Sequence, residues 1–328
     1  MKQPGSVLII QTAFLGDVIL ATALVESIHQ KFPNAHIDFV LRKGNEELLA
    51  GHPLIRKVFI LDKHRKYMSL LSLISDFRKN RYDYLINVQR FTTTGLMTIL
   101  SGARTTIGFD KNPLSFFFSK RVPHIVGGVH EVERNQGLLE SLGINHHAQP
   151  RLYPSALQFD KVKDLKTQSY ITVSPASVWY TKQWPSEKWI EFLSGVDTKW
   201  KIFLLGAVND FDYCKGIHER LPGKTVVNLS GKLTLLESAA LMKDAHMNFV
   251  NDSAPMHLAS AMNTSVTAVY CSTVPSFGFG PLSERSFVIE TKESLACRPC
   301  GLHGYRDCPQ GHFKCALTIS PGQLHQVL

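Results

Sequence analysis

The chain has 328 residues, which exceeds what one ordinary hydrophobic core organises, so we expect two domains. Hydrophobic residues make up 44% and charged residues 19%, which excludes a disordered chain, and no apolar stretch approaches the roughly 20 residues that span a bilayer. The formal net charge of +9 favours an anionic partner: a nucleic acid, a phosphorylated substrate or an acidic membrane surface.

The first predicted elements are a buried strand over residues 7–11 and a helix from Asp17 to about Lys31. The strand is apolar, a short loop follows, and apolar residues then recur at helical spacing. A secretion signal would need a longer apolar run without Asp17 in its middle, so we expect strand, loop and helix. Asp17 is then placed at a helix N-terminus, whose dipole favours the ionised carboxylate. Without an export signal, the six cysteines are expected to be thiols or metal ligands in a cytoplasm.

Strand and helix patterns alternate through the rest of the first half, which is typical of βαβ units with a parallel sheet. The predicted strands cover residues 36–42, 57–62 and 83–89, and the predicted helices cover 45–52, 69–80 and 130–144, the last ending in Gly143. A polar, proline-bearing stretch over residues 145–165 follows. We therefore predict one domain over residues 1–155 and a second over residues 156–328.

The second half repeats the alternation. Its predicted strands cover residues 170–176, 201–207, 225–231, 247–252 and 265–271, and its predicted helices cover 186–196, 209–221, 234–245 and 253–262. The fold class is α/β. Two open α/β domains facing one another would bind ligands at the carboxyl ends of their strands.

The stretch "VNDSAPMHLASAM" (residues 250–262) is typical of a helix that opens directly after a strand. Asp252 and Ser253 stand where N-cap residues are expected, and Pro255 stands in the first turn. The free amides of such a helix suit a diphosphate. Ordinary capping of a structural helix is the alternative, and His257 faces a phosphate or packs in the core.

The loop in "SPASVWYTKQWPSEKW" (residues 174–189) carries Ser177, Thr181 and Lys182. A lysine on a rigid loop can neutralise the charge that builds on a departing diphosphate. A solvated surface lysine is the alternative, but the neighbouring Trp179, Tyr180 and Trp184 favour a functional loop.

The pair Asp210 and Asp212 forms a D-x-D pattern just beyond a predicted strand. Its position favours a contact of Asp210 with ribose hydroxyls. A metal bridging the phosphates of a nucleotide and a solvated helix start are the alternatives.

The C-terminal stretch "ACRPCGLHGYRDCPQGHFKC" holds four cysteines at a spacing that could enclose a structural zinc ion. The candidate ligands are Cys297, Cys300, Cys308 and Cys315. Reduced thiols that organise a loop are the alternative.

Taken together and in this order, "FLGDVILATALV", "TKQWPSEKW", "NDSAPMHLA" and "CPQGHFKC" resemble glycosyltransferase family 9, the ADP-heptose:lipopolysaccharide heptosyltransferases. The cysteine-rich end is most similar to the heptosyltransferase II branch. The resemblance implies a GT-B architecture of two Rossmann-like domains with parallel sheets facing a central cleft. It places the acceptor on the first domain and the nucleotide sugar on the second. It also implies cytoplasmic, inverting, metal-independent heptose transfer that requires no cofactor.

The resemblance also assigns roles to single residues. It makes Asp17 the proposed base and Lys182 the cation that stabilises the diphosphate leaving group. The remaining implied contacts with the nucleotide sugar are Asp252 with the sugar hydroxyls, His257 and Ser177 with the phosphates, and Asp210 with the ribose. Thr181 on the lysine loop and Ser253 at the helix start complete the predicted binding set.

Two departures from the family pattern leave the sugar itself open. Ala254 replaces the usual glycine of "DSG", and "SPAS" replaces a "PGA" start to the lysine loop. A related family member that uses another nucleotide sugar is therefore an alternative, and a GT-B nucleotide-sugar epimerase is a further one.

The basic excess concentrates in the N-terminal half. Its members are Arg56, Lys57, Lys63, His64, Arg65, Lys66, Arg78, Lys79, Arg81, Arg104, Lys120 and Arg121. Such a face would attract an anionic, lipid-linked glycan acceptor and the inner face of the cytoplasmic membrane. A nucleic-acid-binding scaffold is disfavoured, because the aromatic residues fall mostly within apolar strands and helices and are not interleaved with basic residues.

Overall fold

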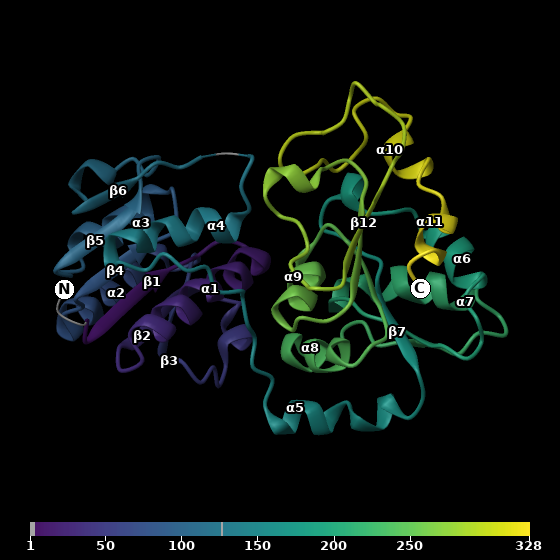
Figure 1. The fold of residues 1–328 in the computed structure, drawn as a ribbon, viewed down its shortest axis with the longest axis horizontal. Coiled ribbons are helices and arrows are strands. Elements are labelled where there is room, and N and C mark those ends of the chain that lie inside the picture. Colours follow the sequence, from purple (N-terminus) through teal and green to yellow (C-terminus); the bar gives the residue numbers. More distant parts are fainter. Residues whose placement is uncertain (1–3, 126) are drawn as a thin grey trace. The chain divides into compact units, whose positions relative to one another are not determined.

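The computed structural model describes residues 4–125 and 127–328. The chain divides into two compact units, Met1–Tyr153 and Pro154–Leu328, and each contains one parallel sheet with helices on both faces (Figure 1). Within the described ranges, no helix combines the length and the apolar character needed to cross a membrane.

The first unit is a six-stranded sheet with four α-helices and short 3-10 turns. Its strands are β1 (Ser6–Ile10), β2 (His36–Arg42), β3 (Ile55–Leu61), β4 (Tyr84–Asn87), β5 (Thr105–Phe109) and β6 (Lys120–Val122). Its α-helices are α1 (Leu15–Lys31), α2 (Lys66–Asn80), α3 (Thr92–Leu100) and α4 (Glu131–Gln136). The 3-10 turns cover Glu46–Leu49, Ser115–Phe117 and Gly137–Leu142.

The second unit is built in the same way. Its strands are β7 (Tyr170–Ser174), β8 (Lys201–Leu204), β9 (Val226–Asn228), β10 (Asn248–Asn251), β11 (Val266–Tyr270) and β12 (Ser286–Glu290). Its α-helices are α5 (Ala156–Lys161), α6 (Ser186–Ser194), α7 (Phe211–Glu219), α8 (Leu235–Lys243), α9 (Ala254–Ala261), α10 (Lys314–Leu317) and α11 (Pro321–His325). The 3-10 turns cover Lys163–Lys166, Tyr180–Lys182, Val208–Asp210 and Pro275–Phe277.

Both sheets have the same strand order. The first runs β3-β2-β1-β4-β5-β6 and the second runs β9-β8-β7-β10-β11-β12, with every neighbouring pair parallel. In such a sheet the strand order reverses between the first and fourth strands, and ligands bind outside the carboxyl ends at that point. The carboxyl ends of β1 and β4 in one unit, and of β7 and β10 in the other, are therefore the places to look for a site.

Apolar side chains hold the helices on the sheets. In the first unit, α1 packs with α4 and α2 packs with α3; in the second, α8 packs with α9 and α6 packs with α7 and α11. Figure 1 shows α8 and α9 on one side of the second sheet and α6, α7 and α11 on the other. The core of the second unit includes the fully buried Trp184 and Trp189, whose ring centroids lie 4.9 Å apart.

The structure confirms the predicted α/β class and the two Rossmann-like units, and it confirms the strand, loop and helix predicted at the N-terminus. The helix predicted over residues 45–52 is wrong. Only a 3-10 turn forms there, because Gly44 and Gly51 take positive φ values of 95° and 71° on either side of it. The helix predicted over residues 130–144 is α4 followed by the 3-10 turn Gly137–Leu142, and it ends, as predicted, at Gly143 with a left-handed backbone.

Candidate active site

The loop that carries Lys182 is fixed to the neighbouring strand. The loop begins at the carboxyl end of β7, and Asn251 at the end of β10 forms hydrogen bonds with both the start and the end of the loop. The Asn251 Oδ1 accepts from the Trp184 amide at 3.0 Å, and its Nδ2 donates to the Pro175 carbonyl at 2.8 Å. The Trp184 indole is buried and donates to the Ala316 carbonyl at 3.2 Å. Asn251 was not predicted as a site residue, although it directly precedes Asp252 in the sequence.

Lys182 pairs with Asp252 at the switch point of the second sheet. The Lys182 Nζ lies 2.7 Å from the Asp252 Oδ2, and the Thr273 hydroxyl donates to the same oxygen at 2.6 Å. Only 15% of the Lys182 side chain and 7% of the Asp252 side chain are exposed. Charges are screened weakly in such a place. The arrangement therefore holds an ammonium group and a carboxylate together at the edge where this fold binds ligands.

Thr181 ties the lysine turn to the C-terminal segment. Its buried hydroxyl accepts from the Tyr305 amide at 2.8 Å and from the Ser272 hydroxyl at 3.0 Å. Gly304 packs against this turn with a φ of 76°, and a Cβ atom there would lie 2.8 Å from the Thr181 Oγ1 and 3.0 Å from the Lys182 Cγ. Only glycine fits this close approach, so the segment around it sets the position of the turn.

Arg298 holds the end of β11 from the same C-terminal segment. Its Nε donates to the Cys271 carbonyl at 2.8 Å, and its Nη2 donates to the Thr273 carbonyl at 2.8 Å and to the Glu290 Oε2 at 2.7 Å. Thr273 in turn contacts Asp252. Sequence reasoning missed Arg298 and Gly304, because their partners are mostly backbone atoms or residues more than a hundred positions away.

The helix that follows Asp252 begins as predicted, with a difference at its cap. Ser253 is the N-cap of α9 and has extended backbone, but its hydroxyl donates to the Asn251 carbonyl at 3.3 Å and does not cap the helix. Pro255 has no amide hydrogen and the Met256 amide donates to the Ser253 carbonyl at 3.0 Å, so this arrangement leaves the Ala254 amide for another acceptor. His257 lies within this helix and is buried, with its ring centroid 6.5 Å from that of Phe279.

Ser177 and Asp210 lie on neighbouring loops at the same edge. The Ser177 amide donates to the Gln183 Oε1 at 3.0 Å, which fixes the backbone near the start of the lysine loop. Asp210 follows β8 and uses its Oδ2 to accept from the Ala207 amide at 2.7 Å. Both side chains are partly exposed. The contacts predicted for them, with phosphate and ribose, stay predictions.

The structure does not support the predicted zinc site. Among the described residues, no group of three or more His, Cys, Asp and Glu side chains is placed to hold a metal ion, and this applies also to Asp210 and Asp212. Cys315 is buried in the apolar core and Cys308 packs against it, whereas the Cys300 thiol donates to the Cys297 carbonyl at 3.2 Å. In this structure Cys308 and Cys315 take part in packing, and Cys297 and Cys300 take part in loop contacts.

Asp17 occupies the corresponding edge of the first unit. It is the third residue of α1, it is partly exposed, and its Oδ2 accepts from the Phe14 amide at 3.1 Å. At the switch point beside it, Gln89, which follows β4, donates a hydrogen bond to Gln11, which follows β1. This hydrogen bond orients the Asp17 carboxylate at the N-terminus of α1.

A buried polar cluster on α4 accompanies Asp17. Burial raises the pKa of Glu131 to about 7; the charge of Arg134 opposes this rise, and the charge of Asp17 adds to it. Arg134 forms an ion pair with Glu131, and its Nε and Nη2 are buried without a hydrogen-bond partner among the described residues. Neither residue was predicted, although "HEVERN" is unusually polar for a helix that packs inward.

The basic residues of the first unit divide between the two edges of its sheet. At the carboxyl edge, a pocket of about 460 Å³ is lined by Arg42, Lys43, Gly44, Leu61, Lys63 and His64. Arg56 has a structural role instead, because its guanidinium donates to the fully buried Asp38.

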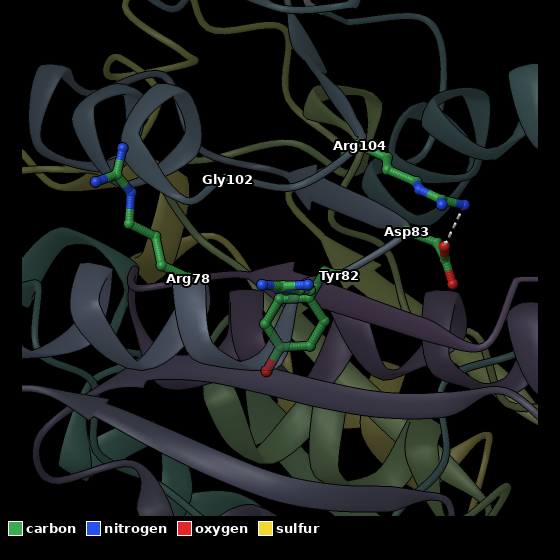
Figure 2. A pocket seen from close by; sticks show the side chains of 6 residues that line it. Arg78, Tyr82, Asp83, Gly102 and Arg104 are labelled. Carbon is green, nitrogen blue, oxygen red and sulfur yellow. Dashed lines mark hydrogen bonds and ion pairs between the residues drawn. The ribbon is translucent and has the colours of Figure 1, made fainter.

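A larger pocket, of about 580 Å³, lies at the opposite edge, before β4 and β5. It is lined by Arg78, Arg81, Tyr82, Asp83, Gly102 and Arg104. Figure 2 shows Arg104 directed at Asp83, with 3.3 Å between Nη1 and Oδ1. This pocket lies far along the strands from Asp17, so it is not part of the candidate active site.

Comparison with known proteins gives one consistent result. A sequence model described as glycosyltransferase family 9 (heptosyltransferase) matches residues 70–302, which is more than half of the chain. A lipopolysaccharide heptosyltransferase 3 of Escherichia coli is 26% identical over 277 residues, covering 79% of this chain and 82% of that protein.

Solved structures agree with the fold. The glycosyl transferase family 9 protein of Veillonella parvula has a TM-score of 0.86 at 21% identity, covering 100% of this chain and 97% of that one. The ADP-heptose lps heptosyltransferase II of E. coli has a TM-score of 0.80 at 18% identity, covering 98% and 97%. The architecture is therefore that of the GT-B heptosyltransferases.

Proposed function

The chain belongs to glycosyltransferase family 9, and from this premise we propose that it transfers a heptose from ADP-heptose to the inner core of lipopolysaccharide. The observation that carries the proposal is the pair of Lys182 and Asp252, held by Thr273 at the switch point of the second sheet. A cation and a carboxylate at this point match what a nucleotide sugar offers, a diphosphate and a set of hydroxyl groups.

In this proposal the second unit, predicted as residues 156–328, binds the nucleotide sugar. Lys182 leaves its ion pair and neutralises the diphosphate, and the first turn of α9 after Ser253 supplies the Ala254 amide to the same group. The released Asp252 accepts from hydroxyls of the sugar. The remaining predicted contacts are Ser177 and His257 with the phosphates and Asp210 with the ribose, and Thr181 belongs to the predicted binding set as part of the lysine loop.

The first unit, predicted as residues 1–155, binds the acceptor. An acceptor hydroxyl attacks the anomeric carbon while the bond to the ADP oxygen breaks, which inverts the configuration at that carbon. Asp17 receives the hydroxyl proton, and the basic pocket of Arg42, Lys43, Lys63 and His64 binds anionic groups of the acceptor. Because Lys182 carries the charge that stabilises the leaving ADP, the step needs no divalent cation.

We propose that the reaction takes place at the cytoplasmic side of the inner membrane, with a lipid-linked acceptor and no nucleic acid. The positive charge of the first unit supports this, since an anionic membrane attracts a basic face.

The proposal is tested by incubating the purified chain with ADP-heptose, with and without the lipid-linked inner-core acceptor, and measuring ADP release and glycan mass. Acceptor-dependent ADP release that persists in a chelator is expected. Transfer only from a different nucleotide sugar would replace the sugar, sugar conversion without acceptor would indicate an epimerase, and metal-dependent turnover would contradict the role given to Lys182.

A further inference from the structure

The first turns of α2 expose apolar side chains that its packing does not explain. Leu70, Leu73, Ile74 and Phe77 make the buried face of this helix. Outside that face, Tyr67 is 78% exposed, Met68 is 73% exposed and Leu71 is 68% exposed. Tyr67 and Leu71 are four residues apart, so they share one side of the helix, and Met68 lies beside them. Three neighbouring exposed apolar residues mark a surface that contacts something other than water.

Positive charge surrounds these apolar residues. Arg65 and Lys66 directly precede Tyr67, both are exposed, and neither forms an ion pair with another described residue. Burial and the charges of Arg42 and Lys66 lower the pKa of the nearby Lys63, which shows how closely the cations gather. Shallow apolar side chains with flanking cations are the combination that binds an anionic lipid surface.

The place in the fold agrees with this partner. Helix α2 starts directly after β3 (Figure 1), so its first turns lie at the carboxyl edge of the first sheet, beside the basic pocket that includes Lys63 and His64. The same edge carries Asp17. A membrane bound at this edge would bring a lipid-anchored acceptor close to Asp17.

We propose that Arg65, Lys66, Tyr67, Met68 and Leu71, named here the α2 docking face, bind the protein to an anionic membrane surface. Tyr67, Met68 and Leu71 enter the headgroup region, and Arg65 and Lys66 contact lipid phosphates. The inference rests on the proposed function only for the reason that docking is useful, since it delivers the enzyme to a lipid-linked acceptor.

The test measures how much protein sediments with vesicles of phosphatidylethanolamine and phosphatidylglycerol, compared with vesicles of phosphatidylcholine alone. The variant Tyr67→Ser/Met68→Ser/Leu71→Ser should partition roughly tenfold less onto the anionic vesicles, and Arg65→Gln/Lys66→Gln should lose a similar factor and most of the salt dependence. The matched control is Leu157→Ser/Lys161→Gln, which removes an exposed apolar residue and a cation from α5 of the other unit and should bind as the parent does.

A second readout separates docking from catalysis. The variant Tyr67→Ser/Met68→Ser/Leu71→Ser should keep full transfer to a soluble acceptor without its lipid, and should lose transfer to the acceptor in vesicles. Equal partitioning of the parent and the α2 variants, or an equal loss in the α5 control, would overturn the docking proposal and leave the proposed function intact. A parent that forms a dimer which the triple variant abolishes would instead assign the face to a second copy. If no acceptor supports transfer while vesicle binding still depends on α2, the proposed function fails and docking stands.

Discussion

The two units share one strand order, but the carboxyl edges of their sheets, where ligands bind in this fold, differ in structure. In the second unit, Lys182 and Asp252 are enclosed by hydrogen bonds from two strands and the C-terminal segment. In the first unit, the same edge carries Asp17 on a partly exposed helix start, next to a basic pocket. The difference teaches that topology fixes where a ligand binds, while the side chains at the strand ends decide whether the site is built in advance or stays open.

An open acceptor edge and a prebuilt nucleotide-sugar edge suit the two substrates proposed for them. A nucleotide sugar is small and constant in shape, so a rigid site loses little entropy on binding it. A lipid-linked glycan is large and held in a membrane, so an exposed edge leaves it room.

The largest loss of turnover is expected when Asp17, at the carboxyl edge of the first sheet, is replaced. Asp17→Asn keeps the size and removes the proton acceptor, so turnover should fall about 100- to 10,000-fold, measured as acceptor-dependent ADP release. ADP binding by calorimetry should not change, because the second unit is untouched. Near-normal turnover would end the assignment of the base. Glu140→Gln, an exposed acid of the same unit, is the matched control.

Replacing Lys182, at the carboxyl edge of the second sheet, should cause the next largest loss of turnover. Lys182→Ala removes the cation opposite the leaving diphosphate, and turnover should fall roughly 100- to 1,000-fold in the same assay. Lys188→Ala on α6 is the control, because that lysine only reaches the exposed Glu191. A loss equally large in both variants would show that general charge, and not the position at the switch point, matters.

Substitutions of Thr181 test whether its hydrogen bonds to the C-terminal segment fix the lysine turn before a ligand binds. Thr181→Val keeps the shape but leaves the Tyr305 amide and the Ser272 hydroxyl without their acceptor, so the free energy of unfolding in urea should fall by about 1–3 kcal/mol. Turnover should fall with it, since the turn carries Lys182. Thr181→Ser keeps the acceptor and should restore both. Full stability of Thr181→Val would show that the segment around Gly304 does not hold the turn.

Glu131 comes last because it probes the first unit through the pH dependence of stability and not through turnover. Its folded pKa of about 7 lies above the ordinary value of 4.5, so the unfolded chain loses this proton first as pH rises. Stability from this group is therefore greatest below pH 4.5 and falls as pH rises through about 7, by about 3 kcal/mol. Urea unfolding across this range should show a flatter profile for Glu131→Gln than for the parent; parallel profiles would contradict the shift.

Much of the fold was predictable because apolar strand runs and amphipathic helices alternate regularly. The sequence analysis missed β5, β6 and β12, which are short and carry polar residues such as Thr105, Lys120 and Ser286, so their apolar period is weak. Their places are set by pairing with longer neighbours, which a local pattern does not contain.

The candidate site was predictable where chemistry sits in one motif and unpredictable where it depends on distant backbone. Lys182 and Asp252 were named from their own loops, and the structure brings them into contact. Their supports were not, since Arg298 donates to two carbonyls of a strand end and Gly304 acts through a missing side chain. The four cysteines have a sequence spacing typical of a zinc site. The described residues nevertheless contain no group of three or more His, Cys, Asp or Glu side chains placed to hold a metal ion.

The contacts of residues 298–305 also affect the order in which parts of the chain can fold during synthesis. During synthesis the first unit can fold while the rest of the chain is still being made, because all strands and helices of that unit precede Pro154. The Lys182 turn gains its hydrogen bond from Tyr305 only after this residue has left the ribosome. A nascent chain that ends before Tyr305 thus lacks a contact that fixes the Lys182 turn, and we expect it to bind the proposed nucleotide sugar weakly.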